Sequence, residues 1–442
     1  MCLREGGTIP DNVQVVSCKI ETLGTGTEAE RMERGDDSVG VFSCMCRVTL
    51  EYGSVEDPKA IMLTDLKTGE AFPKTMMVKV TPSGFGERLL GNLVGFFNTE
   101  VEMYKRDILG QVGMKAPKLY FAAHDDMTGA RYILMIEDLA PRKPPKQHQG
   151  EGGFLIEHAK ETASELTKLH SAYWNCVHEK NMGLSRGGFL IDNPGLLNTS
   201  LKLYVDGLEF GLDWIKNTMK LELSQQTLDY TQLLKANIDG YCKYREDYAV
   251  ERGGFTNCTL IHGDPRPENL FLNPLTFIDF QLAMESPPEH DLMWICMYGF
   301  ESKYRRTHEI DLLFHYHAEL GKRGIDLSKH TIENSAFHFA DEAGFMFAQQ
   351  IIAIKDMAKK IEQDPNMGAM FVTVLKRLDI FIQDWDIANM LQFHLNRVNT
   401  GKTKEPITND DWRSCIPEAQ LSKIDSYKAS LDVLIFKIIA IF

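Results

Sequence analysis

The sequence lacks an uninterrupted apolar run of about twenty residues, the length that a membrane-spanning helix needs. The longest apolar stretch near its end, Leu431 to Phe442, is broken by Asp432 and Lys437. The first twelve residues contain no apolar stretch of the signal-peptide type. We therefore expect no membrane span and a cytoplasmic location.

Paired cysteines are also missing. Nine cysteines are scattered from Cys2 to Cys415, but no two are spaced as CxxC, and none has a metal-ligand spacing to histidine. This pattern is typical of reduced thiols in a cytosolic protein rather than of a disulfide framework or a zinc site.

Basic residues are also fewer than acidic residues. Lys and Arg number 48 against 62 Asp and Glu, which gives a formal net charge of −14. Such a balance works against electrostatically driven binding to nucleic acid or to an anionic membrane. With 43% hydrophobic and 25% charged residues, the 442-residue chain has ordinary globular composition and is long enough for two or three compact units.

The first third of the chain is rich in strand-like patterns. Short apolar or alternating runs are separated by turns rich in Gly, Asp and Pro. These runs are Val13 to Cys18, Val41 to Tyr52, Thr75 to Val80 and Tyr132 to Ile136. One helix is expected among them, at Leu93 to Ile108. Pro141 to Gly153 reads as a connector, because no periodic apolar face runs through it.

Beyond the connector the pattern becomes helical. Apolar residues with helical spacing predict six long helices. They are Phe154 to Trp174, Tyr204 to Leu221, Leu228 to Arg252, His308 to Arg323, Ile332 to Ile361 and Val372 to Leu395. Two short β-like runs interrupt them between Thr259 and Glu285. The pattern predicts an α+β protein with a small β-rich lobe, residues 1–140, and a larger helical lobe, residues 141–442.

The interruption contains the densest cluster of polar residues. The segment His262 to Asn269 reads HGDPRPEN, and IDFQ follows at Ile278 to Gln281. Asp264, Asn269 and Asp279 thus follow one another at the ends of short strands. Their oxygens suit Mg²⁺ bound together with a phosphate chain. In phosphoryl transfer, Asp264 would accept the hydroxyl proton, while Asn269 and Asp279 would hold the metal.

Each of these residues also has an ordinary structural role. An Asp after Gly is usually a turn residue, Asn269 could cap a turn, and Asp279 could be a surface carboxylate at a strand end. Asp279, however, lies in the otherwise apolar run Leu275 to Phe280, where an unpaired carboxylate would be costly. We therefore favour the functional interpretation of the set as a whole.

HGD, four residues, Asn and then Ile-Asp-Phe-Gln resemble the catalytic loop and metal-binding Asp of the aminoglycoside phosphotransferase and choline kinase superfamily. The greatest likeness is to its ecdysteroid-kinase-like, or CHK kinase-like, branch. The resemblance implies the two-lobe protein-kinase fold, with the catalytic loop at 262–281. It also implies ATP and Mg²⁺ as cofactors and a small-molecule hydroxyl as phosphate acceptor.

Two further segments resemble the superfamily's nucleotide-binding lobe. Lys79, at the end of a strand, resembles the lysine that holds the α and β phosphates of ATP. The stretch Phe96 to Tyr104 resembles the helix whose Glu pairs with that lysine; Glu100 is the better match and Glu102 the fallback. A lysine drawn into a partly buried cleft needs such a carboxylate to keep its charge and its orientation.

The resemblance implies other site residues. Backbone groups from Glu137 to Leu139 would bind the adenine edge. His262, Arg266 and Asp291 would support the catalytic loop, and His170 is expected to pack and brace it.

The phosphate-covering turn is ambiguous. Gly24 to Thr27 competes with Gly35 to Ser43, and we favour Gly40 and Ser43 because they lie at the entry of the next strand.

The acceptor is not specified by the sequence. Aromatic and acidic residues of the helical lobe would suit either an amine or a sterol-like alcohol, and they are equally typical of a packed core. They are Trp294, Tyr298, Phe300, Tyr304, Trp385, Asp341, Glu342, Asp384 and Asp386. A protein acceptor is disfavoured, because the roughly eleven residues after Asp279 are too few for a peptide-docking segment. The alternative is a nucleotide- or ligand-binding scaffold of the same fold without turnover.

Overall fold

The computed structural model describes most of the chain. It covers residues 2–23, 43–57, 59, 61–65, 69–82, 88, 91, 95–125, 131–145, 154–177, 194–250, 257–363, 365–403, 405 and 407–439. These residues form two compact units. The first contains Met1–Pro145 and Glu268–Ala283, and the second is built chiefly from Ser185–Pro267 and Met284–Phe442.

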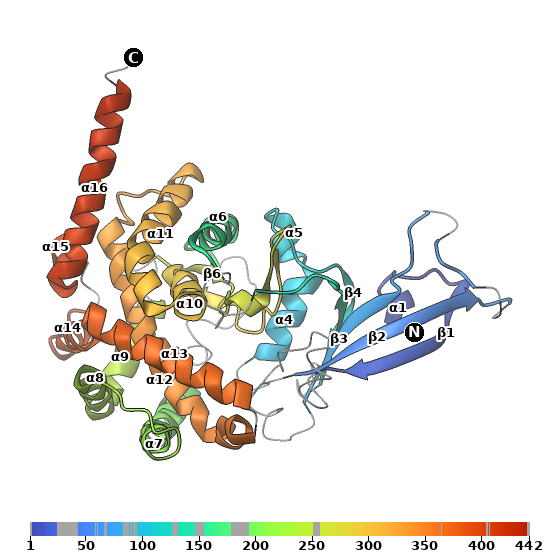
Figure 1. Cartoon of the computed structure of the whole chain (residues 1–442), viewed down its shortest axis with the longest axis horizontal. Helices are drawn as coiled ribbons and strands as arrows, with labels where there is room; N and C mark the ends of the chain where they lie inside the picture. Colours follow the sequence, from blue (N-terminus) through green and yellow to red (C-terminus); the bar gives the residue numbers. More distant parts are fainter. Residues whose placement is uncertain are drawn as a thin grey trace. The chain divides into compact units, whose positions relative to one another are not determined.

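One antiparallel sheet forms the centre of the first unit, with strand order β1-β2-β3-β5-β4 (Figure 1). The strands are β1 (Val13–Thr22), β2 (Cys44–Ser54), β3 (Thr75–Val80), β4 (Leu119–His124) and β5 (Tyr132–Glu137). The four predicted strand runs are confirmed. Strand β4 was missed, because its short LYFAAH sequence has two alanines and no clear alternation.

Strand β3 lies in the middle of the sheet and presents its residues alternately to two faces. Met76 and Val78 join an apolar core with Leu50 and Tyr52. Lys79 has the opposite parity, and it pairs in register with Leu134 of β5. A lysine therefore stands on the second face of the sheet, in its central strand.

The predicted helix at Leu93 to Ile108 is two helices in the structure, α4 (Phe96–Lys105) and α5 (Ile108–Gln111). Helix α4 begins after Gly95, whose φ of 77° falls in the left-handed region that glycine adopts readily. Phe97 of α4 stacks on Tyr132 with ring centroids 4.6 Å apart. This packing fixes the helix beside β4 and β5.

A hairpin from late in the sequence also belongs to the first unit. Strands β7 (Leu270–Phe271) and β8 (Thr276–Phe277) pair with each other. The Phe277 N–H donates to the Lys115 carbonyl at 2.9 Å. The Arg142 guanidinium donates to the Phe271 carbonyl at 3.0 Å and to the Pro274 carbonyl. The segment predicted as one catalytic loop, 262–281, is thus divided between the two units after Pro267.

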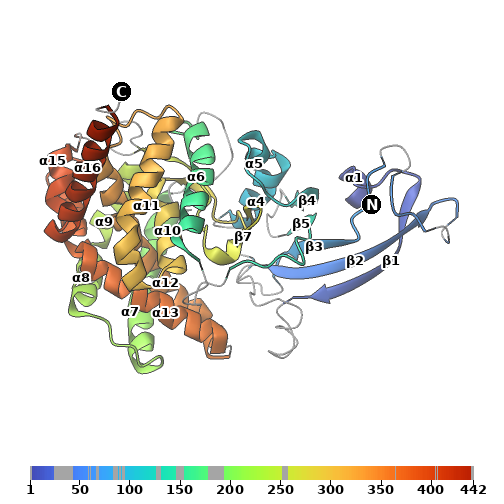
Figure 2. The same cartoon turned by 45° about the horizontal axis from the view of Figure 1, so that its top comes forward.

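The second unit is almost entirely helical (Figures 1 and 2). Its helices are α6 (Ile156–Ala172), α7 (Pro194–Asn217), α8 (Gln225–Ala236), α9 (Ile238–Val250), α10 (Glu289–Gly299), α11 (Ser302–Lys322), α12 (Ile332–Gln363), α13 (Pro365–Trp385), α14 (Ile387–Asn399), α15 (Asn409–Cys415) and α16 (Glu418–Ile439). The long helix α12 packs against α7, α10 and α13. A two-stranded sheet of β6 (Thr259–Ile261) and β9 (Met284–Ser286) brackets the polar segment.

Two further helix predictions needed correction. The stretch Leu228 to Arg252 is two helices that meet at Asn237, and Val372 to Leu395 is two helices that meet at Asp386. Asp386 has φ 48°, a left-handed conformation that ends a helix. Helix α10 is buried on nearly every side, so no apolar stripe alternates with a polar one.

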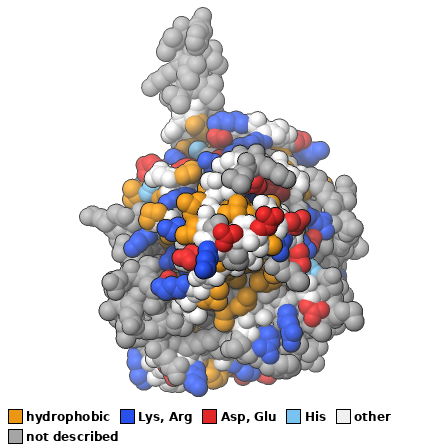
Figure 3. All heavy atoms as spheres, turned by 90° about the vertical axis from the view of Figure 1, so that its right-hand side faces the viewer, with side chains coloured by type: hydrophobic (Ala, Val, Ile, Leu, Met, Phe, Trp, Pro, Cys, Tyr) orange, Lys and Arg blue, Asp and Glu red, His pale blue; other side chains and the backbone are white. Residues whose placement is uncertain are grey.

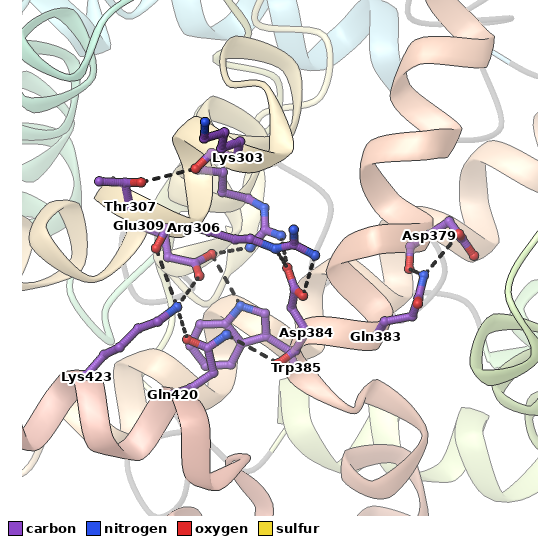
Figure 4. Close-up of polar contacts among 11 residues, drawn as sticks. Lys303, Arg306, Thr307, Glu309, Asp379, Gln383, Asp384, Trp385, Gln420 and Lys423 are labelled. Carbon is purple, nitrogen blue, oxygen red and sulfur yellow. Dashed lines mark hydrogen bonds and ion pairs between the residues drawn. The ribbon is translucent and has the colours of Figure 1, made fainter.

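A polar cluster joins α11, α13 and α16 (Figure 4). Arg305, which is 1% exposed, pairs with both Glu309 and Asp384. Arg306 holds the same Asp384 by two hydrogen bonds of 2.7 and 2.8 Å. Lys423 of α16 lies 3.9 Å from Glu309. Charged side chains therefore fix the C-terminal helix to the helical unit.

Exposed apolar residues concentrate in the first unit, around β1 and the segment after β2. They are Val15, Val16, Ile20, Val55, Ile61 and Leu63. Figure 3 looks onto the side of the molecule where these strands lie, and hydrophobic side chains gather near the centre of that face, with acidic ones among them. Within the described residues, no helix is both long and apolar enough to cross a membrane. Among the described residues, which include all nine cysteines, no disulfide bond is formed.

Candidate active site

A buried lysine with two carboxylate partners forms the polar centre of the first unit. Lys79 Nζ lies 2.7 Å from Oε1 of Glu100 on α4 and 3.0 Å from Oδ1 of Asp279. Lys79 and Glu100 are 4% and 0% exposed, whereas the Asp279 side chain keeps 26% of its surface exposed. One positive and two negative charges leave this trio with a net charge of −1. The partly exposed Asp279 is the member that an incoming cation can reach.

The pKa of Lys79 reflects this environment. Burial alone would lower it, but the negative charges of Asp279 and Glu100 outweigh burial and raise the pKa well above its ordinary value. The lysine therefore stays protonated. Glu102, the fallback partner, instead bonds to Arg106 at 2.8 Å and takes no part in the trio.

A second layer of hydrogen bonds holds the trio. The Gln281 amide donates to Glu100 Oε2 at 3.3 Å and lies 3.5 Å from the Tyr132 hydroxyl. Tyr132 in turn forms a side-chain hydrogen bond with Ser43. Gln281 and Tyr132 were not singled out from the sequence. The available signal was that Gln281 follows Asp279 by two residues.

Two residues whose side-chain oxygens could bind a metal lie at the same end of the β7–β8 hairpin. Leu270 pairs with Phe277, and the Ile278 N–H donates to the Asn269 carbonyl at 3.0 Å. Asn269 and Asp279 are therefore neighbours at this end. Asp279 has φ 65°, in the left-handed region that Asp adopts more readily than most non-glycine residues. A carboxylate and an amide oxygen are hard donors of the kind that Mg²⁺ takes, so this pair fits the expected metal.

In the second unit, Asp291 of α10 holds the HGD segment through backbone hydrogen bonds. Its two carboxylate oxygens accept the N–H groups of His262 and Gly263, each at 2.8 Å. His170 of α6 lies 3.1 Å from Asp291 Oδ2 and 2.7 Å from the Tyr316 hydroxyl. Burial would raise the pKa of Asp291, but the His170 hydrogen bond and charge lower it, so the carboxylate stays ionised.

Asp264 lies within this braced turn. Its N–H donates to His262 Nδ1 at 3.2 Å, and its side chain is 7% exposed. Arg266 lies 3.6 Å from Asp264 Oδ2, and its guanidinium carbon lies 5.9 Å from the centre of the Tyr298 ring. The arrangement places a carboxylate in a rigid loop with one cation beside it. Asp291 thus joins the backbone of this loop to His170.

The remaining predicted site residues are placed less completely. Gly40 and the competing turn Gly24 to Thr27 lie outside the described residues, whereas Ser43 is buried against Tyr132. The Glu137 N–H donates to the Lys118 carbonyl at 2.9 Å and is therefore committed to the sheet. Leu139 lies beyond the end of β5, and its carbonyl accepts the Arg142 N–H at 3.0 Å.

Comparison with known proteins gives three kinds of similarity. Residues 40–328 match the model of the ecdysteroid kinase-like family. An uncharacterized oxidoreductase, dhs-27, from Caenorhabditis elegans is 25% identical over 199 residues, which are 44% of this chain and 22% of that protein. The chain therefore spans about a fifth of the length of this curated relative.

The third kind is similarity to solved structures, of which two are described here. A putative aminoglycoside phosphotransferase from Ralstonia eutropha JMP134 is 12% identical, with a TM-score of 0.42, over 83% of this chain and 92% of that one. A choline/ethanolamine kinase family protein from Mesorhizobium loti is 12% identical, with a TM-score of 0.39, over 87% of this chain and 93% of that one.

The family match covers well over half of the chain and includes Lys79, Glu100, the HGD segment, Asp279 and Asp291. The resemblance predicted from these motifs is confirmed, and with it the class of kinase-type phosphotransferases. The chain belongs to the ecdysteroid kinase-like family.

Proposed function

We propose that this protein transfers the γ-phosphate of ATP, bound with Mg²⁺, to a hydroxyl group of a small molecule. The observation that carries the proposal is the buried trio of Lys79, Glu100 and Asp279, with its net charge of −1. A structural ion pair needs no second carboxylate. A site for a metal–nucleotide complex needs a cation for the phosphates and a carboxylate for the metal.

Each residue has a defined task in this proposal. Lys79 binds phosphate oxygens, and Glu100 keeps it charged and oriented. Asp279 and Asn269 hold Mg²⁺, which supplies charge neutralisation on the phosphates. Asp264 accepts the proton of the attacking hydroxyl.

Asp291 and His170 act on the loop rather than on the substrate. By accepting two backbone N–H groups, Asp291 fixes the turn in which Asp264 lies. A base that is held rigidly needs no reorganisation when it receives a proton, which is the benefit of a preorganised site.

The test compares two carboxylate variants in two assays. Thermal unfolding with and without Mg²⁺-ATP reports binding, and Mg²⁺-dependent ATP hydrolysis or transfer reports turnover. Asp264→Asn should keep the thermal shift and lose at least about a hundredfold of the turnover, a typical contribution of a general base. Asp279→Ala should lose both.

Two results would count against the proposal. Normal turnover of Asp264→Asn removes that residue from the role of base. A thermal shift without any Asp264-dependent turnover favours a nucleotide-binding scaffold instead.

A further inference from the structure

A chain of buried polar side chains leads through the helical unit to the HGD segment. It joins α11, α6 and α10, three helices that pack against one another (Figures 1 and 2). Tyr316 of α11, His170 of α6 and Asp291 of α10 each have 0% of their surface exposed. The Tyr316 hydroxyl lies 2.7 Å from His170 Nδ1, and His170 Nε2 lies 3.1 Å from Asp291 Oδ2. The sequence did not single out Tyr316.

The protons of this chain follow from which groups have a partner. Among the described residues, His170 Nδ1 is the one hydrogen-bond partner of the Tyr316 hydroxyl. If Nδ1 donated this bond, the hydroxyl proton would be buried without an acceptor, which costs free energy. The Tyr316 hydroxyl therefore donates to Nδ1. The proton of the neutral imidazole then lies on Nε2, from which it donates to Asp291.

The Tyr316 hydroxyl keeps its proton for this purpose. Burial raises its pKa well above the ordinary value, and the negative charges of Glu289 and Asp291 raise the pKa further. The hydroxyl is therefore a permanent donor at the far end of the chain.

The other tautomer of His170 would disturb the carboxylate that the chain reaches. Asp291 Oδ2 accepts both the His170 Nε2 proton and the His262 N–H, while Oδ1 accepts the Gly263 N–H. A nitrogen lone pair in place of that proton would face Oδ2 at 3.1 Å and repel it. The carboxylate would have to turn away, and the two backbone N–H groups that it holds would lose their alignment.

The His170 ring cannot simply follow a displaced carboxylate. The Thr259 hydroxyl of β6 donates to the His170 carbonyl at 2.7 Å, and β6 continues directly into His262. The Tyr316 ring packs edge-on against the His170 ring, with centroids 5.7 Å apart and 72° between the planes. The imidazole is thus held at its backbone and at one edge, in the orientation that satisfies both ring nitrogens.

We propose that Tyr316 is a positioning residue for phosphoryl transfer. Its hydroxyl selects the His170 tautomer that holds Asp291, and Asp291 holds the turn that carries Asp264. Because Tyr316 is fully buried, it acts only through His170. The effect on turnover rests on the proposed function, but the tautomer and the hydrogen bonds of the turn can be measured without nucleotide.

The first measurement is the state of the His170 ring, observed by NMR of its two ring nitrogens in the full chain. His170→Asn identifies the two signals by their disappearance. In the parent protein, Nδ1 should have the shift of an unprotonated nitrogen and Nε2 that of a protonated one. In Tyr316→Phe, Nδ1 loses its donor while the aromatic ring stays in place, so both signals should change.

The second measurement is hydrogen exchange of the two loop amides. Tyr316→Phe should speed exchange of the His262 and Gly263 N–H groups about tenfold relative to amides in the middle of α12, as loss of one hydrogen bond implies. Tyr427→Phe is the matched control. The Tyr427 hydroxyl donates to Asp311 of α11 at 2.8 Å, so the control removes a bound hydroxyl that contacts the same helix. It should leave both loop amides unchanged.

The third measurement separates kcat from KM. Tyr316→Phe should lower kcat about three- to tenfold and change the KM for Mg²⁺-ATP by less than about twofold, because Lys79 and Asp279 belong to the other unit. Adding Tyr316→Phe to His170→Asn should lower kcat no further, because the hydroxyl has already lost its acceptor.

Three outcomes would overturn the inference: a proton on His170 Nδ1 in the parent protein, equal exchange rates in Tyr316→Phe and Tyr427→Phe, or additive effects of Tyr316→Phe and His170→Asn on kcat. A parent protein without transfer activity, with the expected tautomer and exchange rates, would instead count against the proposed function alone.

Discussion

Lys79 and Asp279 are 200 residues apart in the sequence, yet Nζ of the first lies 3.0 Å from Oδ1 of the second. The contact joins the central strand of the sheet to the segment after the β7–β8 hairpin. A divalent cation that binds Asp279 therefore meets a carboxylate already shared with an ammonium group. We expect metal affinity in the absence of nucleotide to be low, because the phosphates must draw Lys79 away first.

Glu100→Gln should weaken nucleotide binding and stability together. The substitution removes one of the two negative charges on Lys79, so the lysine turns more fully to Asp279 and competes with the metal. We expect about tenfold weaker Mg²⁺-ATP binding and about 1–3 kcal/mol lower stability, the usual cost of disturbing a buried charged hydrogen bond. Isothermal titration and denaturant unfolding measure the two effects.

The matched control is Glu102→Gln, two residues along the same helix. Glu102 bonds to the partly exposed Arg106, so its loss should change either quantity by less than about 1 kcal/mol. Equal effects of the two substitutions would show that helix charge, rather than the Lys79 contact, controls binding.

Arg305 and Arg306 are neighbours whose contributions to the free energy of unfolding can be compared directly. Both bind Asp384, but Arg305 is 1% exposed, whereas the Arg306 side chain is 49% exposed. Arg305→Ala leaves Glu309 buried without its partner and should cost about 3–5 kcal/mol. Arg306→Ala should cost about 0–1 kcal/mol. Urea unfolding of both variants measures these losses of stability. Similar losses would contradict the expectation that the buried arginine contributes more than the exposed one.

Gly211 lies at a close approach of α7 to α12. A Cβ atom at Gly211 would lie 2.3 Å from the Ile351 carbonyl oxygen, so Gly211→Ala must push the two helix backbones apart. We expect a loss of about 1–3 kcal/mol, as for overpacking of a core. At Gly207 the nearest atom is the Ile352 Cγ2 methyl at 3.1 Å, which can move aside. Gly207→Ala should therefore be much milder in thermal unfolding.

The Asp341–Glu342 pair predicts a particular pH dependence. Burial raises the pKa of Asp341 to about 6 from its ordinary 3.8, so the stability it contributes is present below pH 3.8 and is lost as pH rises through about 6. Burial would also raise the pKa of Glu342, but Arg245 and His290 lower it to about 2, so its contribution persists until pH falls through about 2.

Asp341→Asn removes the pH-dependent contribution of Asp341 to stability. Its unfolding free energy should gain about 1–3 kcal/mol relative to the parent protein between pH 4 and pH 7. Denaturant unfolding at both pH values measures this difference. A parallel pH dependence of parent and variant would mean that folding does not raise the pKa of Asp341.

The sequence identified the residues of the site better than their surroundings. Lys79 and Glu100 were singled out because their segments resemble the superfamily's phosphate-holding lysine and the helix that carries its carboxylate partner. The partners Gln281 and Tyr132 were missed, because nothing local marks a side chain that bonds to a residue on another strand. The same holds for His290 and Glu342, whose meeting depends on how two helices cross.

Helix boundaries were predicted wrongly where the apolar periodicity continues across the end of a helix. Asp386 and Asn237 interrupt helices within stretches whose apolar pattern continues on both sides. Such boundaries are decided by backbone conformation and tertiary packing, which a single sequence expresses weakly.

The membership of Glu268–Ala283 in the first unit has a practical consequence for dissecting this protein. A gene fragment that stops at residue 145 would encode Lys79 and Glu100 but not Asp279, and it would leave Arg142 without the carbonyls it binds. The first unit is therefore discontinuous in the sequence. A split-protein pair cut near residue 145 would have to reassemble across that hairpin before either half acquired the complete charge trio.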